Sequence, residues 1–296
     1  MKVVGGQAVI EGVMMRSGNK IATAIRKQGK IKVKKETLTM WGERYPILKI
    51  PFVRGFVNLL ELMIVGIRTL EYSAQEAVGE NEKISKGALT LTVAFAIAAG
   101  IFLFVLLPYF LTYVMGLKEQ NQPFLFNLTD GIVKLIVLVA YIYAIGFLND
   151  VKVLFQYHGA EHKAIAAYEH GKAVDVKNAK KYATAHARCG TSFLLFVILV
   201  GVILFSFVPL IVFRLFPYVL TMHWLARYTI LFLARLVTLP IIAGVAYELL
   251  RLSAKIDENS VLRMVLWPGL AVQKLTTREP TSKQLEVAVA ALKAVL

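Results

Sequence analysis

Four of the five histidines in this 296-residue chain lie in one stretch, residues 150–191. They are His158, His162, His170 and His186. His158 and His162 are four residues apart, so on a helix they share one face, where two imidazoles can bind the same metal ion. With Glu161 they form the pattern H-x-x-E-H, in which two histidines bind zinc and the glutamate activates water in inverted zinc peptidases. The pattern predicts a divalent metal site, with zinc as the first candidate ion.

A second pair of potential ligands ends the same stretch. His186 and Cys189 are separated by two residues and could complete a tetrahedral site or leave one position for water. Cys189 is the only cysteine, so no intramolecular disulfide can form, and a lone thiol is typical of a reducing compartment. The alternative is structural, because the motif is short and both residue types also serve as ordinary buried or hydrogen-bonding side chains. Both interpretations stay open at this stage.

Two acidic residues are candidates for catalysis. Glu161 lies beside the two imidazoles, and Glu248 follows an apolar segment at a point from which it could reach the histidine stretch. Glu161 or Glu248 is predicted to handle protons in a metal-assisted reaction. The alternative for Glu248 is an ion pair on the helix surface, with Arg251 or Lys255.

The elements that must position these residues are mostly membrane helices. The chain is 57% hydrophobic and only 18% charged, which is too apolar for a soluble domain of this length. Four windows are long and apolar enough to cross a bilayer as helices: residues 88–117, 132–149, 192–213 and 228–247. Arg235 is the single charge in the fourth window, and it either faces the bundle interior or reaches toward the outer end. The expected fold is mainly α, a four-helix transmembrane bundle.

The distribution of basic residues predicts the orientation. Lys and Arg number 15 in residues 1–87, seven in 150–191 and seven in 249–296, against one in 118–130 and two in 214–227. Four spans with both termini in the cytoplasm place every basic segment inside. The net charge of +15 is then explained by contact with anionic lipid, so we expect the lipid bilayer and no nucleic acid as a partner. The N-terminus lacks the features of a secretory signal peptide.

The remaining segments flank the bundle. Residues 1–55 predict a basic, β-rich cytoplasmic cap, with one strand over 7–16 and two more, 21–26 and 30–34, around a Gln28-Gly29 turn. The glycine-rich start of this cap predicts a tight β turn, and Glu11 within it is a distant candidate ligand. Residues 56–87 predict an amphipathic interfacial helix, and 249–296 a cytoplasmic helical tail. The membrane domain between them spans 88–248 and includes the cytoplasmic loop 150–191.

Five stretches also carry a resemblance to a known family. They are residues 5–17, 157–163 with Tyr168-Glu169, 186–193, Tyr247-Glu248 with Arg251, and 268–280. In these the sequence resembles the YqhQ-like family of bacterial integral membrane proteins of unknown function, whose members are labelled predicted metal-dependent enzymes. The resemblance covers nearly the whole chain. It implies a multi-pass protein of the bacterial cell (inner) membrane, and it does not define an activity.

Two functions follow from these observations. The first is a metal-dependent hydrolase at the cytoplasmic membrane surface, acting on a lipid, a lipid-linked precursor or a membrane-protein segment. The second is a non-enzymatic scaffold or assembly factor that binds other membrane proteins, with a structural metal or none; a closed four-ligand site would favour it. A transporter ranks third, because the predicted spans hold too few ionisable residues to line a polar path.

Overall fold

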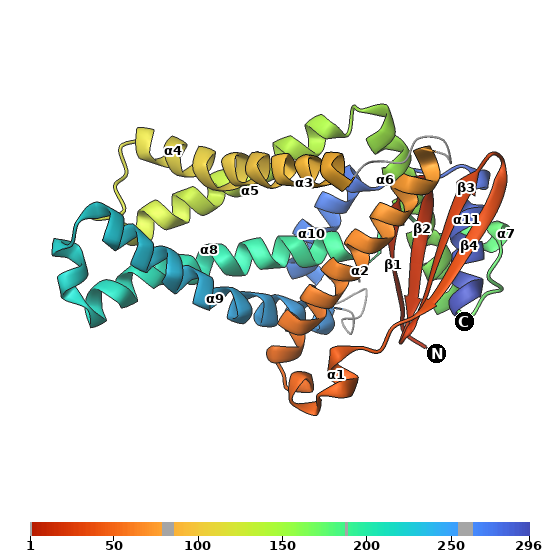
Figure 1. The fold of residues 1–296 in the computed structure, drawn as a ribbon, viewed down its shortest axis with the longest axis horizontal. Helices are drawn as coiled ribbons and strands as arrows, with labels where there is room; N and C mark the ends of the chain where they lie inside the picture. Colours follow the sequence, from red (N-terminus) through yellow and green to blue (C-terminus); the bar gives the residue numbers. More distant parts are fainter. Residues whose placement is uncertain (1, 79–85, 187–188, 254–262) are drawn as a thin grey trace.

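The structure is a computed structural model of the chain, and it describes residues 2–78, 86–186, 189–253 and 263–296. Lys255, a suggested partner of Glu248, lies outside these residues. In chain order the elements are β1 (Val4–Val9), β2 (Gly12–Ser17), β3 (Lys20–Lys27), β4 (Lys30–Thr37), α1 (Trp41–Arg44), η1 (Pro46–Lys49), α2 (Val53–Val78), α3 (Lys86–Ile101), η2 (Phe102–Leu106), α4 (Leu107–Val114), α5 (Pro123–Ile145), α6 (Asn149–Glu169), α7 (Val176–Ala179), α8 (Gly190–Leu215), η3 (Pro217–Thr221), α9 (Trp224–Ser253), α10 (Arg263–Thr276) and α11 (Ser282–Val295). The molecule is elongated, with the long apolar helices at one end and the sheet and both chain termini at the other (Figure 1).

Four helical segments of the described residues are long and apolar enough to cross a membrane, as the sequence predicted. They are Thr90–Val114, Pro123–Ile145, Phe193–Leu215 and Trp224–Leu252. The first contains a π-helical segment, η2, directly before Pro108, whose missing N–H cannot complete a regular helical ladder. The second begins earlier than the predicted 132–149, because its charged residue Asp130 pairs with Lys134 one turn later and so does not interrupt the helix. It also ends earlier, at Ile145.

Arg235 is partly buried and reaches the connection between α4 and α5 and the start of α5, at the end of the bundle away from the sheet, so its side chain combines the two predicted positions. Its guanidinium donates hydrogen bonds to the Glu119 carboxylate and, at 2.7 Å, to the Asn127 side-chain oxygen. Glu119 is buried, so the pair compensates two charges that would be costly in an apolar surrounding.

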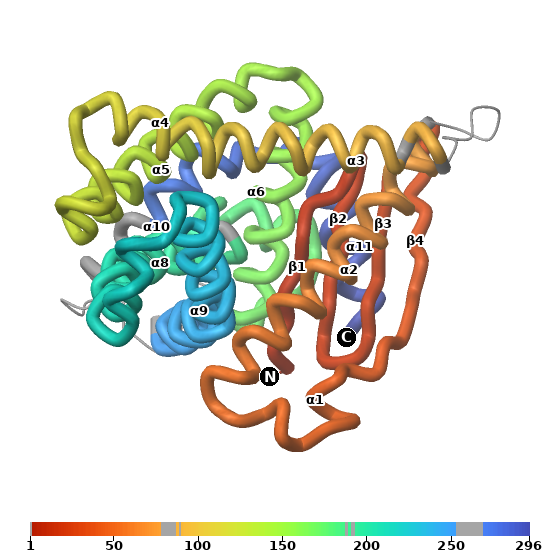
Figure 2. Tube along the Cα trace, turned by 60° about the vertical axis from the view of Figure 1, so that its left-hand side comes forward, coloured from red at the N-terminus to blue at the C-terminus, as the bar shows by residue number. Residues whose placement is uncertain are grey.

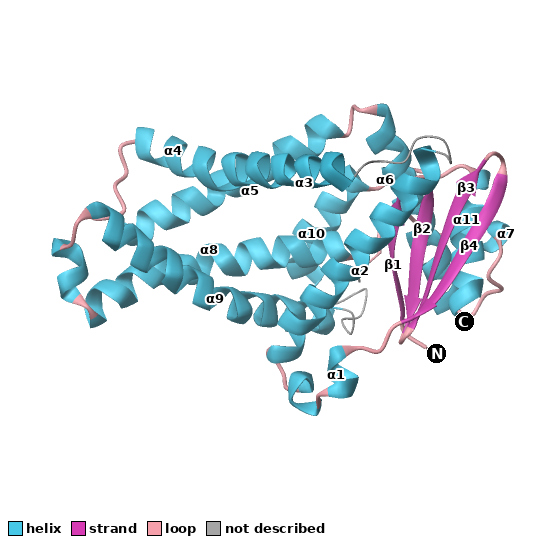
Figure 3. Ribbon diagram, in the orientation of Figure 1, coloured by secondary structure: helices cyan, strands magenta, loops and turns pink. Residues whose placement is uncertain are grey.

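All strands of the described residues form one antiparallel sheet in the order β1-β2-β3-β4 (Figure 3). The predicted Gln28-Gly29 hairpin is confirmed, and both residues have the positive φ that a two-residue turn requires. The predicted single strand over 7–16 is wrong, since a turn at Ile10-Glu11 splits it into β1 and β2. Glu11 adopts a φ of 52° there, a conformation that the alternation of side chains does not signal.

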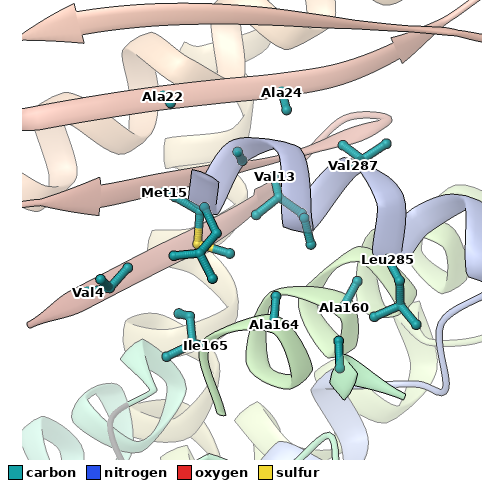
Figure 4. Packing of buried hydrophobic residues seen from close by; sticks show 14 of the residues in the cluster. Val4, Val13, Met15, Ala22, Ala24, Ala160, Ala164, Ile165, Leu285 and Val287 are labelled. Carbon is teal, nitrogen blue, oxygen red and sulfur yellow. The ribbon is translucent and has the colours of Figure 1, made fainter. Parts of the chain in front are cut away.

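Helices cover both faces of the sheet (Figure 2). On one face Val9, Met14 and Ile21 pack against Val65 of α2. On the other face the core residues come from β1 to β3, α6 and α11, and they include Val13, Met15, Ala160, Ala164 and Leu285 (Figure 4). The small alanines of α6 allow this helix to approach the sheet closely. The sheet therefore fixes the position of α6, which carries the H-x-x-E-H motif.

The three stretches predicted as cap, loop and tail contact one another. α11 packs against β2, β3 and α6, and its first turn is closed by a capping box between Thr281 and Gln284. α2 packs against both the sheet and α9. These contacts join the N-terminal sheet, α6 and the C-terminal helix into one α/β unit beside the bundle. The predicted domain boundaries and the cytoplasmic placement of this unit stay predictions.

Candidate metal site

Three side chains from two parts of the chain meet at the end of the bundle nearest the sheet. His158 and His162 lie one turn apart on α6, as predicted, and Cys189 lies directly before α8. The His158 Nε2 atom is 3.2 Å from the Cys189 Sγ atom, and the two imidazole ring centres are 4.4 Å apart. One potential ligand atom of each residue lies within 4.8 Å of the other two. In a tetrahedral zinc site, nitrogen and sulfur ligands are about 3.5 Å apart, so the cluster has the size of a metal site.

Backbone carbonyls fix the orientation of both imidazoles. The His158 Nδ1–H donates to the Thr276 carbonyl oxygen at 2.9 Å, and the His162 Nδ1–H donates to the Thr184 carbonyl oxygen. With each Nδ1–H directed to a carbonyl oxygen, the Nε2 atoms lie on the side of Cys189, where a neutral imidazole would present its lone pair. Metal-binding histidines in proteins are held in this way by a second partner. Burial lowers the pKa of the His162 imidazole, which favours the neutral form that a metal ligand requires.

The two carbonyls belong to segments that lie against α6 at Gly159. A Cβ atom at Gly159 would be 2.1 Å from the Arg278 carbonyl oxygen and 3.1 Å from the Thr184 methyl group. The Arg278 N–H also donates to the Phe155 carbonyl oxygen at 3.0 Å. Gly159 thus allows both supporting segments to reach the imidazoles. Residues 268–280 carry part of the family resemblance, but no spacing or motif within them predicts this positioning role.

Glu161 is buried beside the two imidazoles. Its carboxylate Oε2 lies 3.9 Å from the His158 Nε2. The backbone N–H of Gly6 in β1 donates a hydrogen bond to the same carboxylate group. Burial raises the pKa of the Glu161 carboxyl above its ordinary value. A Cβ atom at Gly6 would be 2.9 Å from the Glu161 Oε1, so only glycine permits this approach. Gly6 therefore allows β1 to lie close to Met14 of β2 and Glu161 of α6. The tight turn predicted for the glycine-rich stretch occurs at residues 10–11.

His186 lies next to this group without belonging to it. Its ring centre is 5.6 Å from that of His162, and its Nε2–H donates to the Glu169 carboxylate at 2.9 Å. The buried Gln273 side chain holds the His186 backbone through two hydrogen bonds, of 2.9 and 2.8 Å. The three side chains whose potential ligand atoms all lie within 4.8 Å of one another are those of His158, His162 and Cys189.

The other two acidic candidates have partners of their own. Arg54 of α2 donates two hydrogen bonds to the Glu248 carboxylate, of 2.7 and 2.6 Å, so Glu248 joins α2 to α9. Glu11 accepts a hydrogen bond from the Tyr157 hydroxyl at 3.2 Å. The structure therefore brings Glu161 to the imidazoles and pairs Glu248 with a basic residue that the sequence did not suggest. Arg54 is 194 positions away in the chain, beyond the range of local spacing arguments.

These features define a class of protein: a mainly helical chain with four helices compatible with membrane spans, an attached α/β unit, and a buried cluster of His, Cys and Glu side chains where the two meet. The chain belongs to the family described as protein of unknown function (DUF1385), whose model matches residues 50–296. It is similar to the uncharacterized protein YqhQ of Bacillus subtilis (strain 168), with 33% identity over 307 residues that cover 96% of this chain and 89% of that protein. The resemblance to a YqhQ-like family is thus confirmed. No solved structure matches the chain significantly.

Proposed function

We propose that this protein is a membrane-bound, metal-dependent hydrolase whose site lies at the cytoplasmic surface of the bacterial cell (inner) membrane. One observation carries the proposal. Two imidazoles, each with its Nδ1–H donated to a backbone carbonyl, direct their Nε2 atoms toward one thiol, and a buried carboxylate lies beside them. A set of three protein ligands leaves a fourth position for water or substrate, which is typical of catalytic zinc sites.

The roles of the side chains follow from their places. His158, His162 and Cys189 would hold the ion, and Cys189 would bind as the thiolate. When bound, a divalent ion supplies Lewis acidity toward a carbonyl or phosphoryl oxygen and makes water a stronger acid. Glu161 is placed to accept a proton at its carboxylate and to donate it later to the leaving group. We assign this role to Glu161 rather than to Glu248, since Arg54 occupies the Glu248 carboxylate.

Membrane attachment supports a substrate that is presented at the bilayer surface. Cys189 precedes by a few residues the candidate span Phe193–Leu215, so the cluster lies at the end of the apolar helices. The sheet, α6 and α11, which belong to the basic segments of the chain, lie at the same end (Figure 1), and this favours the cytoplasmic side. A lipid, a lipid-linked precursor or a segment of a membrane protein would each reach the site from there.

A second candidate function is a scaffold or assembly factor with a structural metal. It is favoured by the burial of the cluster and by its position between α6, the start of α8 and the end of α10. A metal ion there would connect these three elements. Rotation of His186 toward the ion would give four protein ligands, the number typical of structural zinc sites.

Metal analysis of protein purified in detergent without chelator tests both candidates. We expect about one zinc ion per chain in the wild type and in His170→Ala, and none in a folded His162→Ala variant. His170 is the matched control, because it ends the same helix and its Nδ1–H donates to the Ala166 carbonyl oxygen. Absence of metal from the wild type would contradict the proposal.

Cobalt substitution separates the enzyme from the scaffold. An open coordination position predicts that added thiocyanate changes the visible spectrum of the cobalt-loaded wild type. A spectrum that does not respond, and that changes instead in His186→Ala, would identify a closed four-ligand site and would contradict the hydrolase.

A further inference from the structure

A second polar site lies away from the histidine cluster, between α1, η1 and the first half of α2. It is a cavity of about 310 Å³. Its polar lining consists of two acidic residues, Glu43 and Glu61, two basic residues, Lys49 and Arg54, and the amide of Asn58. A volume of this size is at the lower end of ligand-binding cavities, so it suits a small polar group rather than a whole lipid.

Three of these charged groups are held in place by other parts of the chain. Glu61 is only 6% exposed, and its Oε1 accepts the backbone N–H of Trp41 at the start of α1. Glu43 accepts a hydrogen bond of 2.6 Å from the Asn19 side chain. Arg54 is held by Glu248. The cavity thus presents charged groups whose positions are already fixed. Binding of a ligand to these groups therefore costs the protein little side-chain entropy.

The arrangement of charge selects a ligand with both signs. An anion alone would meet Glu43 and Glu61, and a cation alone would meet Lys49 and Arg54. A zwitterion avoids both repulsions, because its phosphate can pair with Lys49, while Arg54 stays bound to Glu248, and its ammonium can pair with the carboxylates. The Asn58 side-chain amide can donate a hydrogen bond to the phosphate and accept one from the ammonium.

The cavity lies beside the end of the fourth candidate span. A Cβ atom at Gly55 would be 2.9 Å from the Gly244 Cα, so the start of α2 is in close contact with α9 inside the span Trp224–Leu252. Figure 1 shows α1 next to this start of α2, at the end of α9 nearest the sheet. Ile47, Ile50 and Phe52, which flank the cavity in sequence, are exposed. Exposed apolar residues beside a span are typical of contact with acyl chains.

We propose that this cavity binds the headgroup of a membrane phospholipid that carries both a phosphodiester and a primary amine. The headgroup occupies the cavity, and the acyl chains remain in the bilayer against Ile47, Ile50 and Phe52. The proposal is independent of the metal site. It gives the segment between the sheet and α2 a lipid-recognition role in addition to its packing on α9.

Native mass spectrometry of the detergent-purified full chain tests this assignment. The probes are dioleoyl phosphatidylethanolamine and dioleoyl phosphatidylglycerol, which share acyl chains and phosphodiester and differ in the amine. We expect the amine-bearing lipid to bind about tenfold more tightly, the equivalent of one charge-assisted hydrogen bond. Equal affinity for the two lipids would overturn the proposal.

Two variants and a matched control locate the binding. Glu61→Gln is expected to abolish the preference for the amine, and Lys49→Gln, at an exposed position, to weaken the binding of both lipids. Lys35→Gln on the exposed strand β4 removes the same charge elsewhere and should bind as the wild type does. If Lys49→Gln and Lys35→Gln bind the amine-bearing lipid equally, the cavity is not the site.

Soluble glycerophosphoethanolamine distinguishes a membrane lipid from a free metabolite with the same headgroup. It should compete with the lipid only at much higher concentration, because it lacks the acyl chains. Competition at equal concentration would refute the assignment to a lipid.

Discussion

The close approach at Gly159 offers a sharp test of how the imidazoles are positioned. Alanine at this position would place a methyl group 2.1 Å from the Arg278 carbonyl oxygen. That oxygen must move by about 1.3 Å to reach ordinary van der Waals contact. Arg278 is two residues from Thr276, whose carbonyl oxygen accepts the His158 Nδ1–H. The substitution should therefore displace the Thr276 carbonyl that orients the His158 imidazole, while the three candidate ligands His158, His162 and Cys189 stay unchanged.

The expected free-energy change has two parts of opposite sign. Gly159 lies inside α6, so alanine would by itself stabilise the helix by about 1 kcal/mol. Overpacking against a backbone carbonyl costs about 3 kcal/mol, the upper end of the usual range, since a backbone cannot move aside as a flexible side chain can. The net loss is about 2 kcal/mol, or a fall of about 3 °C in the unfolding temperature of a 296-residue chain.

Thermal unfolding in detergent and zinc content are the two measurements. Gly159→Ala should unfold at a lower temperature and hold less zinc than the wild type. Gly190→Ala is the matched control, because Gly190 follows Cys189 directly and a Cβ there would meet nothing within 4 Å. Wild-type zinc content together with an unchanged or higher unfolding temperature in Gly159→Ala would refute the reasoning.

Three further predictions concern other contacts of the site. Gly6→Ala should lower the unfolding stability by about 1–3 kcal/mol, because its methyl would lie 2.7 Å from a β2 carbonyl, whereas Gly5→Ala meets nothing within 4 Å; equal unfolding temperatures would contradict this. Cys189, the only thiol, should react slowly with maleimide until a chelator removes the metal, and a rate that chelation leaves unchanged would argue against a thiolate ligand. Arg54→Ala and Glu248→Ala should be coupled by about 1–3 kcal/mol in a double-mutant cycle, and additive effects would show that the bidentate pair does not join α2 to α9.

The sequence was sufficient for features that depend on local patterns. Long, mostly apolar windows predicted four helices compatible with membrane spans, and the Gln28-Gly29 pair predicted a hairpin. The four-residue spacing of His158 and His162 predicted their common face on α6. In each case the signal lies within one element, where periodicity and turn chemistry act directly.

The sequence was insufficient for contacts between distant segments. His158 is 118 positions from Thr276, whose carbonyl oxygen orients it, and no spacing rule connects them. The same holds for Gly6 and Glu161, which meet only because the sheet packs on α6. The turn at residues 10–11 was missed because apolar residues flank it on both sides, so the stretch resembles one continuous strand.

His186 and Cys189 illustrate the limit of a spacing motif. Their separation by two residues is typical of metal ligands, and the sequence suggested both. In the structure Cys189 lies with His158 and His162, while Gln273 holds the His186 backbone and Glu169 accepts a hydrogen bond from the His186 imidazole. The difference arises from partners on α6 and α10 that the short motif does not contain.

X-ray absorption at the zinc edge of the purified protein tests the central claim most directly, namely that two imidazoles and one thiolate bind a single ion. The claim predicts one sulfur at about 2.3 Å and nitrogen or oxygen neighbours at about 2.0–2.1 Å. In Cys189→Ser the sulfur contribution should disappear. A protein without bound metal after chelator-free purification, or a spectrum with sulfur that is unchanged in Cys189→Ser, would contradict the claim.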